Sequence, residues 1–332
     1  MGNQAGPETI NRLRAAADAA FAMLAGMQLD LFTPLKNGPM TAEQIAAAIG
    51  VAPTRLRLLL YCLVAAGLLT EHNGKFANTP EANQFLVKGN PSYMGNKHGN
   101  IAHRWSSCFK TAESIRSGVP QAKLDFSNSP PQELETFLRT INVNTVPAAR
   151  ALIEKYDFSS VKTLADVGSG GAGLAITISK AHPHIRATAI DLPQVVPIAR
   201  KIINEERMDN RIDVIAANVV TDSLPGSYDV AVLRGFLQVL SREDARLAVK
   251  NIGAVVNPGG KIYIIAQILD DSRVSPAEAV GFNLAFVNAY DAGESYTEAE
   301  HREWLTDAGF VEIERADDLL DGSGLMTARK SD

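Results

Sequence analysis

Apolar runs and amphipathic segments alternate regularly along the second half of the chain. Runs rich in β-branched residues predict strands at 163–167, 186–190, 212–216, 228–233 and 261–266. Segments with helical spacing separate these runs, as in a parallel sheet that carries helices on both faces. A final pair of runs, at 310–314 and 324–328, predicts an antiparallel edge. The pattern therefore predicts an α/β domain with a doubly wound sheet over residues 161–332.

The first part of the chain, residues 10–90, has a mostly helical pattern. Thr41 and Gln44 have the spacing of a capping box, and Asn73-Gly74 is typical of a tight hairpin turn. The expected elements are, in order, a helix over 15–31, a helix over 42–49, a helix over 54–66 and a hairpin of strands 68–70 and 75–77. This order is that of a winged helix.

Residues 91–160 form a connector between these two patterns. Its first part is rich in Asn, Ser, Gly and Pro, and carries at least one helix, over about 99–117. A longer helical pattern follows at 133–156. Pro147 interrupts that pattern, and we expect two helices there because proline removes a backbone donor from the helix interior.

Composition and charge narrow the functional classes. The chain has 332 residues, 46% hydrophobic and 21% charged, with a net charge of −5, so no electrostatic footprint for duplex nucleic acid is expected. The predicted helix over 54–66 has an apolar face and only two cations, Arg55 and Arg57, which favours a subunit interface over base reading. The chain begins with no secretory signal and has no apolar run of membrane-spanning length, so we expect a cytoplasmic protein without a membrane partner. Cys62 and Cys108 are expected to be buried thiols, and no cluster has metal-ligand spacing.

A glycine-rich loop follows the first predicted strand, and an acid ends the second. The segments are Asp166-Val-Gly168-Ser169-Gly170 and Ile190-Asp191-Leu192. Glycines let the backbone approach a ligand closely, and an acid after the second strand suits ribose hydroxyls. The glycines alone also fit a dinucleotide site. Asp166 would repel a pyrophosphate and attract the cationic methionine end of S-adenosylmethionine, so we expect that cofactor, with S-adenosylhomocysteine as its product.

Three further segments follow in order: Tyr228-Asp-Val-Ala-Val-Leu-Arg234, Asn257-Pro-Gly-Gly-Lys-Ile and Tyr296-Thr-Glu-Ala-Glu. With the two preceding motifs, the chain resembles the S-adenosylmethionine-dependent small-molecule O-methyltransferases of the caffeate, acetylserotonin and hydroxyneurosporene type. The resemblance implies a Rossmann-like methyltransferase domain and an N-terminal dimerisation domain. It also implies a homodimer, a small-molecule acceptor, and a connector that covers the acceptor site.

The resemblance also assigns cofactor contacts. Asn218 stands where the family usually has an aspartate that binds the adenine amino group, and its amide oxygen can accept the same hydrogen bond. Arg234 replaces the usual lysine, and Ala172 replaces a glycine. The expected cofactor-binding residues are Asp166, Gly168, Ser169, Gly170, Asp191, Leu192, Asn218, Val219 and Arg234.

The chain departs from the family at the general base. Aligning the motifs places Gln238 where the family has its catalytic histidine, and Ser295 where it has the glutamate that orients that histidine. A general base typically adds ~10²–10⁴-fold to the rate, whereas positioning can contribute on the order of 7–11 kcal/mol. Activity therefore does not require the base. Methylation of oxygen, of a thioether sulfur or of carbon all stay open, as do two other classes, a nicotinamide oxidoreductase and a winged-helix regulator.

The residues expected around the acceptor come from several helices. Those with polar or aromatic side chains suited to the acceptor are Gln238, His103, Arg104, Asn142, Asn283 and Tyr290, with Phe282 and Phe286 beside them. His103 is a possible substitute base. His182 and His184 are expected in a solvated turn, and His301 on the surface.

Overall fold

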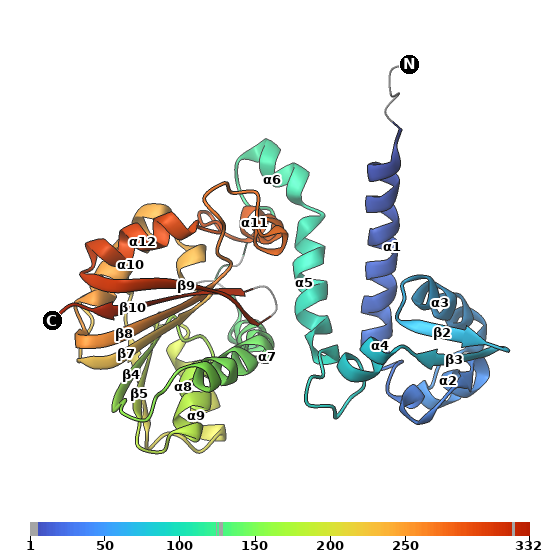
Figure 1. Cartoon of the computed structure of the whole chain (residues 1–332), viewed down its shortest axis with the longest axis horizontal. Coiled ribbons are helices and arrows are strands. Elements are labelled where there is room, and N and C mark those ends of the chain that lie inside the picture. Colours follow the sequence, from blue (N-terminus) through green and yellow to red (C-terminus); the bar gives the residue numbers. More distant parts are fainter. Residues whose placement is uncertain (1–5, 124, 126–128, 321–322) are drawn as a thin grey trace. The chain divides into compact units, whose positions relative to one another are not determined.

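The computed structural model describes residues 6–123, 125, 129–320 and 323–332. The chain divides into two compact units, Met1–His103 and Arg104–Asp332. Helix α5 (His98–Cys108) contains the boundary between them. Figure 1 shows the order of the elements in each unit.

The first unit contains the predicted helices and hairpin. Thr41 and Gln44 form the expected capping box, and Gly50 ends the following helix in the left-handed conformation. A three-stranded sheet has the order β1-β3-β2. The elements are α1 (Glu8–Gln28), η1 (Pro34–Asn37), β1 (Met40–Thr41), α2 (Ala42–Ile49), α3 (Pro53–Ala65), β2 (Leu69–His72), β3 (Lys75–Asn78), α4 (Pro80–Phe85) and η2 (Gly95–Lys97). The winged-helix assignment itself stays a prediction.

Helices α1 and α3 leave large apolar side chains in solvent. Ile10 and Leu13 on α1, and Leu58 and Tyr61 on α3, are all more than half exposed. Cys62 on α3 is exposed as well, so the expectation of a buried thiol is wrong there, while Cys108 is half-buried. The neighbours of Cys62 in sequence are apolar, but they belong to different faces of the helix. Exposed apolar side chains of this size suit a protein contact.

The second unit is built on a seven-stranded sheet with the order β6-β5-β4-β7-β8-β10-β9. Its strands are β4 (Thr163–Val167), β5 (Arg186–Asp191), β6 (Ile212–Ala216), β7 (Tyr228–Arg234), β8 (Val256–Ala266), β9 (Phe310–Leu320) and β10 (Ser323–Lys330). The first five are parallel, and β10 pairs antiparallel with both β8 and β9. The predicted strands and the antiparallel edge are therefore confirmed.

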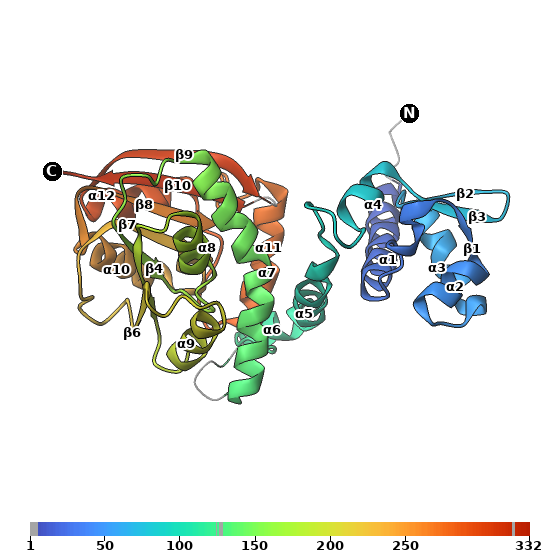
Figure 2. The same ribbon diagram turned by 90° about the horizontal axis from the view of Figure 1, so that it is seen from below.

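Helices cover both faces of this sheet (Figures 1 and 2). One face packs against α7 (Pro131–Lys155), α8 (Gly173–Ala181) and α9 (Val196–Glu205), and the other against α10 (Arg242–Gly253) and α12 (Glu298–Asp307). Alternation along β7 divides the two cores: Val230 and Val232 face the first layer, whereas Ala231 and Leu233 face the second. Buried on both faces, the parallel strands read as continuous apolar runs.

The strand order reverses between β4 and β7. After β4 the chain builds β5 and β6 on one side, then crosses to build β7 and β8 on the other. Loops that leave the carboxyl ends of β4 and β7 therefore diverge, and this switch point is where open α/β sheets bind ligands. The glycine loop begins there.

Helix α7 runs without a break through Pro147, so the expectation of two helices is wrong. Proline removes one helical hydrogen bond at this point. Ala148, Ala149 and Leu152, directly after the proline, are buried against the sheet layer. This tertiary packing outweighs the local cost. The helix predicted over about 99–117 is in fact two helices, α5 and then α6 (Thr111–Ser117).

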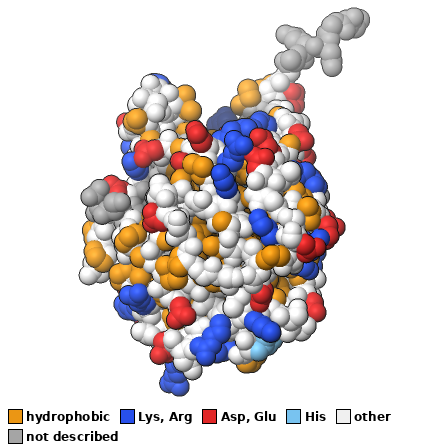
Figure 3. Space-filling view, turned by 90° about the vertical axis from the view of Figure 1, so that its left-hand side faces the viewer, with side chains coloured by type: hydrophobic (Ala, Val, Ile, Leu, Met, Phe, Trp, Pro, Cys, Tyr) orange, Lys and Arg blue, Asp and Glu red, His pale blue; other side chains and the backbone are white. Residues whose placement is uncertain are grey.

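Charged side chains of both signs lie among apolar ones on the face of the molecule shown in Figure 3.

Among the described residues, no single helix is long and apolar enough to cross a membrane. Helices α2 and α3, bent by 110° from one another, reach that length and apolar composition only when they are taken together. Within the same residues, no group of three His, Cys, Asp or Glu side chains is placed to hold a metal ion.

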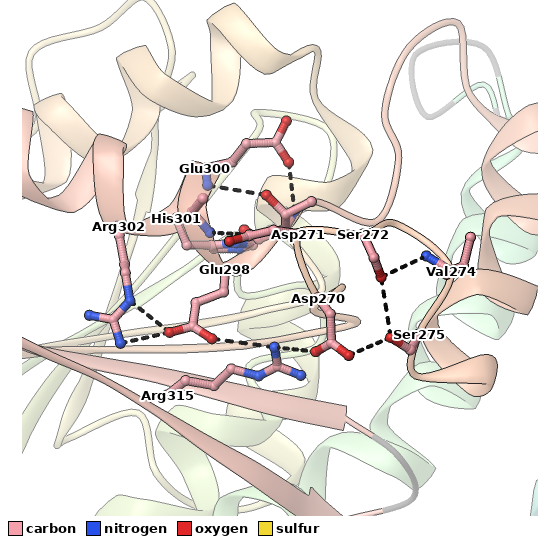
Figure 4. Close-up of polar contacts among 12 residues, drawn as sticks. Asp270, Asp271, Ser272, Val274, Ser275, Glu298, Glu300, His301, Arg302 and Arg315 are labelled. Atoms are coloured by element: carbon pink, nitrogen blue, oxygen red, sulfur yellow. Dashed lines mark hydrogen bonds and ion pairs between the residues drawn. The ribbon is translucent and has the colours of Figure 1, made fainter.

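An ionic network joins β9, α12 and the segment before α11 (Ala277–Ala289) (Figure 4). Arg315 Nη1 lies 2.8 Å from Asp270 Oδ1 and 3.4 Å from Glu298 Oε2. Arg302 also pairs with Glu298, and the Ser275 hydroxyl donates to Asp270. The network ties the C-terminal strands to the loop that leads into α11.

His301 lies beside this network and is buried, so the expectation of a surface histidine is wrong. Its Nδ1 is 2.8 Å from Thr297 O, and its ring lies 5.3 Å from the ring of Trp304. The Nε2 atom is buried, and none of the described residues forms a hydrogen bond with it. Burial lowers the pKa of His301 to about 4, so the ring is neutral at physiological pH.

The buried neutral histidine makes stability depend on pH. Because the pKa of His301 is about 4 in the folded chain and about 6.5 when unfolded, the unfolded state binds more protons between these values. The free energy of unfolding should therefore fall by up to about 3 kcal/mol as the pH drops from 6.5 to 4. Denaturant titrations followed by the fluorescence of the two tryptophans, one of them Trp304, measure this.

His301→Leu should remove that part of the pH dependence, since Thr297 O still accepts from the backbone of residue 301. His184→Leu, at an exposed position, is the matched control and should keep the wild-type slope. Equal slopes for wild type and His301→Leu would contradict the assignment.

Candidate functional site

The loop after β4 is held against the end of β5 by backbone hydrogen bonds. The amides of Gly168 and Ser169 donate to Ile190 O at 2.9 and 3.2 Å, and Gly170 N donates to Asp191 Oδ2 at 2.7 Å. Gly168 and Gly170 have φ of +64° and +54°, a region that favours glycine. A side chain at Gly168 would also collide with Phe236, since an ideal Cβ lies 2.5 Å from its Cδ2.

Ala172 ends the loop in the same left-handed conformation, with φ of +56°, where the family has glycine. This conformation costs an alanine roughly 1–2 kcal/mol. Ala172 N donates to Ser169 O at 2.8 Å, and the methyl group is fully buried in the core beneath the loop. Burial of that methyl group offsets part of the strain at the start of α8.

Asp166 lies directly beneath the loop and is 1% exposed. Its Oδ2 accepts from Ala175 N at 2.9 Å, in the first turn of α8. Burial raises the pKa of Asp166 to about 7, although the Ala175 amide opposes the shift and the nearby Asp191 adds to it. One carboxylate oxygen is therefore directed toward the N-terminus of α8. The expected attraction of Asp166 for the cationic end of the cofactor stays a prediction.

Asp191 is at the carboxyl end of β5 and is partly exposed. Its Oδ1 accepts from Leu192 N at 2.7 Å, and its Oδ2 accepts from Gly170 N. Burial raises the pKa of Asp191, while the two amides oppose this. Each oxygen has a second lone pair, so the carboxylate can also accept from two hydroxyls. The Leu192 side chain packs against the core under α7 to α9.

Asn218 and Val219 follow β6 at the same edge of the sheet. Asn218 Oδ1 accepts from Val220 N at 3.0 Å, and Asn218 N donates to Asp222 Oδ2 at 2.8 Å. The amide oxygen thus closes a local turn, with one lone pair remaining for a ligand amine. Val219 is 3% exposed and belongs to the core, so its backbone is the part that can meet a ligand.

Helix α7 packs onto the loop from above. Asn142 Nδ2 donates to Gly171 O at 3.1 Å, and a Cβ at Gly173 would lie 2.7 Å from Asn142 Oδ1. One turn on, Thr145 Oγ1 accepts from Arg234 Nη1 at 3.3 Å, at the end of β7. In the structure the Asn142 amide supports the glycine loop, and a contact of Asn142 with the acceptor stays a prediction. Phe236 and Thr145 were missed because their partners lie far away in sequence.

Gln238 lies on a short 3-10 helix, η3 (Leu237–Val239), and not on the long helix after β7. It is buried, and its Oε1 accepts from Gln267 N at 3.0 Å. The fixed oxygen leaves the Nε2 end as a hydrogen-bond donor. An amide at this position cannot take up a proton.

Ser295, where the family has a glutamate, is fully buried. Its amide donates to Asn283 Oδ1 at 2.7 Å, and its hydroxyl donates to Ala279 O at 2.9 Å. Both contacts are to α11, so Asn283 and Ser295 join this helix to the following segment. Gly293 of that segment packs on η3, since its Cβ would lie 2.5 Å from Gln238 O.

Aromatic rings follow one another along α11 and its C-cap. The ring centroids of Phe282 and Phe286 are 5.4 Å apart, and those of Phe286 and Tyr290 are 6.1 Å apart. Burial raises the pKa of Tyr290 to about 12, so it stays protonated. The guanidinium carbon of Arg104 lies 5.2 Å from the centroid of Phe282.

The structure thus brings together in the second unit all the predicted site residues except His103. His103 belongs to the first unit, and Arg104 begins the second. Among the described residues, the carboxyl edge of the sheet combines two carboxylates with amide groups, and a separate row of aromatic rings lies on α11 and its C-cap. The carboxylates and amides suit a cationic adenosyl ligand.

Comparisons with known proteins agree with this reading. A family model for an O-methyltransferase domain matches residues 116–311, and one for an O-methyltransferase dimerisation domain matches residues 16–88. A 3-hydroxy-5-methyl-1-naphthoate 3-O-methyltransferase of Streptomyces sahachiroi is 28% identical over 88% of this chain and 86% of its own length. An L-tyrosine C(3)-methyltransferase of Streptomyces lavendulae is 26% identical over 86% of this chain and 82% of its own.

Human N-acetylserotonin methyltransferase, solved in complex with S-adenosylmethionine, has the same fold, with a TM-score of 0.79 and 21% identity. The similarity covers 100% of both chains. The two family models together span most of the chain, in the order that the structure shows. The chain therefore belongs to the S-adenosylmethionine-dependent O-methyltransferase family and carries that family's dimerisation domain.

Proposed function

We propose that this protein is a homodimeric enzyme that methylates a small organic acceptor by positioning it, without a side-chain general base. The observation that carries the proposal is the Gln238 amide. The oxygen of this amide accepts from Gln267 N, and an amide cannot take up a proton. The position of the family's glutamate is occupied by Ser295, whose buried hydroxyl cannot act as a base either. The remaining contribution is alignment of the acceptor, which can be worth on the order of 7–11 kcal/mol.

The residues at the edge of the sheet fit S-adenosylmethionine. The left-handed glycines open the loop to the methionine end, Asp191 offers two oxygens to the ribose hydroxyls, and Asn218 accepts from the adenine amine. When bound, this cofactor supplies the methyl group on a positively charged sulfur. The buried carboxylate of Asp166 stabilises a positive charge above the loop, and Arg234 is held in place by Thr145.

The Gln238 donor favours an acceptor that is already an anion. A hydrogen bond from Nε2 to a phenolate oxygen stabilises the ionised form and so lowers the pKa of the phenol. We therefore favour O-methylation of an aromatic hydroxyl, the kind of acceptor named for the naphthoate relative. The tyrosine C-methyltransferase among the relatives keeps C-methylation as the alternative, since an electron-rich carbon needs no base. S-methylation of a thioether acid also needs no base, but neither of these two relatives is named for it.

The first unit supplies the dimer contact in this proposal. Its dimerisation-family match and the exposed apolar side chains of α1 and α3 support association with a second copy. Residues 10–90 would form this domain, residues 91–160 the helical cover of the acceptor, and residues 161–332 the cofactor domain.

Replacing Asp191 tests the cofactor site. Asp191→Ala should weaken the binding of S-adenosylhomocysteine about 10- to 150-fold, since hydrogen bonds to a charged group contribute about 1.5–3 kcal/mol. Isothermal titration calorimetry measures the dissociation constant. Asp213→Ala, at an exposed position on the neighbouring strand β6, is the matched control and should bind normally. Tight binding of NAD with no binding of S-adenosylhomocysteine would contradict the proposal and favour an oxidoreductase.

The missing base has a kinetic signature. With a phenol as acceptor, log kcat/KM should rise with pH up to the pKa of the phenol itself. It should show no inflection near 6.5, the usual value for histidine. Transfer of radiolabelled methyl groups at a series of pH values measures the profile. An inflection near 6.5 that disappears in His103→Ala would show instead that a histidine from α5 acts as the base.

A further inference from the structure

Arg104 holds its charge over an aromatic ring. Its guanidinium carbon is 5.2 Å from the centroid of Phe282, and the side chain is partly exposed. Within the described part of the chain, no carboxylate forms an ion pair with it. A guanidinium stacked on a ring keeps the N–H groups at its edge directed outward, in the fork that matches a carboxylate. Arg104 is therefore placed to bind an anion that none of the described residues supplies.

The acidic side chains that follow α11 already have cationic partners. Asp291 pairs with Lys123, and Glu294 lies 3.0 Å from Arg273 Nη1. Arg273 also pairs with Glu300 of α12. Each of these three carboxylates thus has a cationic partner, whereas no carboxylate of the described residues pairs with Arg104.

Next to Arg104, α11 and its C-cap carry uncharged aromatic side chains, of which Phe282 and Tyr290 are partly exposed and Phe286, between them, is 3% exposed. Phe282, Phe286 and Tyr290 form a continuous row of rings, and the raised pKa of Tyr290, about 12 through burial, keeps its hydroxyl protonated. A single cation at the end of such a row fits a planar ligand with one anionic group.

Short contacts connect this row to the residues at the cofactor loop. Phe282 is adjacent to Asn283, whose Oδ1 accepts from Ser295 N. Gly293, two residues before Ser295, packs against the carbonyl oxygen of Gln238. Phe236, on the same turn as Gln238, packs against Gly168. These contacts link α11, through the segment 293–295 and η3, to the glycine loop.

From this geometry we infer that the acceptor is an aromatic carboxylate, and that Arg104 binds its carboxylate while the row Phe282–Phe286–Tyr290 holds its ring. Arg104 is then the residue that selects acids over neutral arenes. The inference rests on the proposed function, since it names the acceptor class of the same site.

Fluorescence titration in the presence of saturating S-adenosylhomocysteine tests whether Arg104 binds the carboxylate of the acceptor. The probes are 3-hydroxy-2-naphthoate and 2-naphthol, which share a ring system and differ in the carboxylate. The wild-type protein should bind the naphthoate at least about 10-fold more tightly than the naphthol, as expected for a charge-assisted pair. Arg104→Gln should remove this preference, and Arg104→Lys should restore part of it. Arg116→Gln, on the exposed side of α6, is the matched control and should keep it.

The outcomes separate the two proposals. Equal affinity for both probes in the wild type, or a preference unchanged by Arg104→Gln, would overturn the role of Arg104. A loss of affinity for both probes together in Arg104→Gln would show that Arg104 only supports the fold of α11, and would also overturn it. If S-adenosylhomocysteine binds and neither probe does, the aromatic acid class is wrong while the methyltransferase proposal stands. Failure to bind S-adenosylhomocysteine would instead reject the proposed function.

Discussion

A buried carboxylate is the constraint around which the cofactor site is arranged. Asp166 is 1% exposed at the end of β4, and a charge in such surroundings is costly unless something compensates it. The Ala175 amide at the start of α8 compensates part of the cost, yet the pKa of Asp166 still rises to about 7 because burial dominates. A cation bound above the loop would supply the rest. In the proposed function, the cost of burying Asp166 is thus recovered when a positively charged ligand binds.

The other features of the loop follow from holding this carboxylate under an open backbone. Gly168 and Gly170 take left-handed conformations so that their amides can reach β5, and Asp191 fixes Gly170 directly. Asn142 closes the loop from the side of α7. The Gln238 oxygen and the Ser295 hydroxyl are bonded to the backbone, and the proposed site therefore positions an acceptor and donates hydrogen bonds without taking up a proton.

The fold was largely predictable from the sequence because the parallel strands are buried on both faces and therefore read as apolar runs. Capping by Thr41 and the left-handed glycines are local signals, and the structure contains both. Pro147 was misjudged because packing of Ala148 and Leu152 on the sheet outweighs a local preference. His301 was misjudged because its helix begins with charged residues, while its own face packs on Trp304. The contact of Asn142 with Gly171 joins residues 29 apart, and no local pattern encodes it.

The central claim is that the Asp166 carboxylate is matched to the charge of a cationic cofactor, and proton release on binding tests it most directly. Titration of S-adenosylmethionine at pH 7, in buffers with different ionisation enthalpies, measures the protons exchanged. A bound cation lowers the pKa of Asp166 from about 7, so the wild-type protein should release a fraction of a proton, and Asp166→Asn should release less. Binding without proton release, or with equal release in both proteins, would contradict the account.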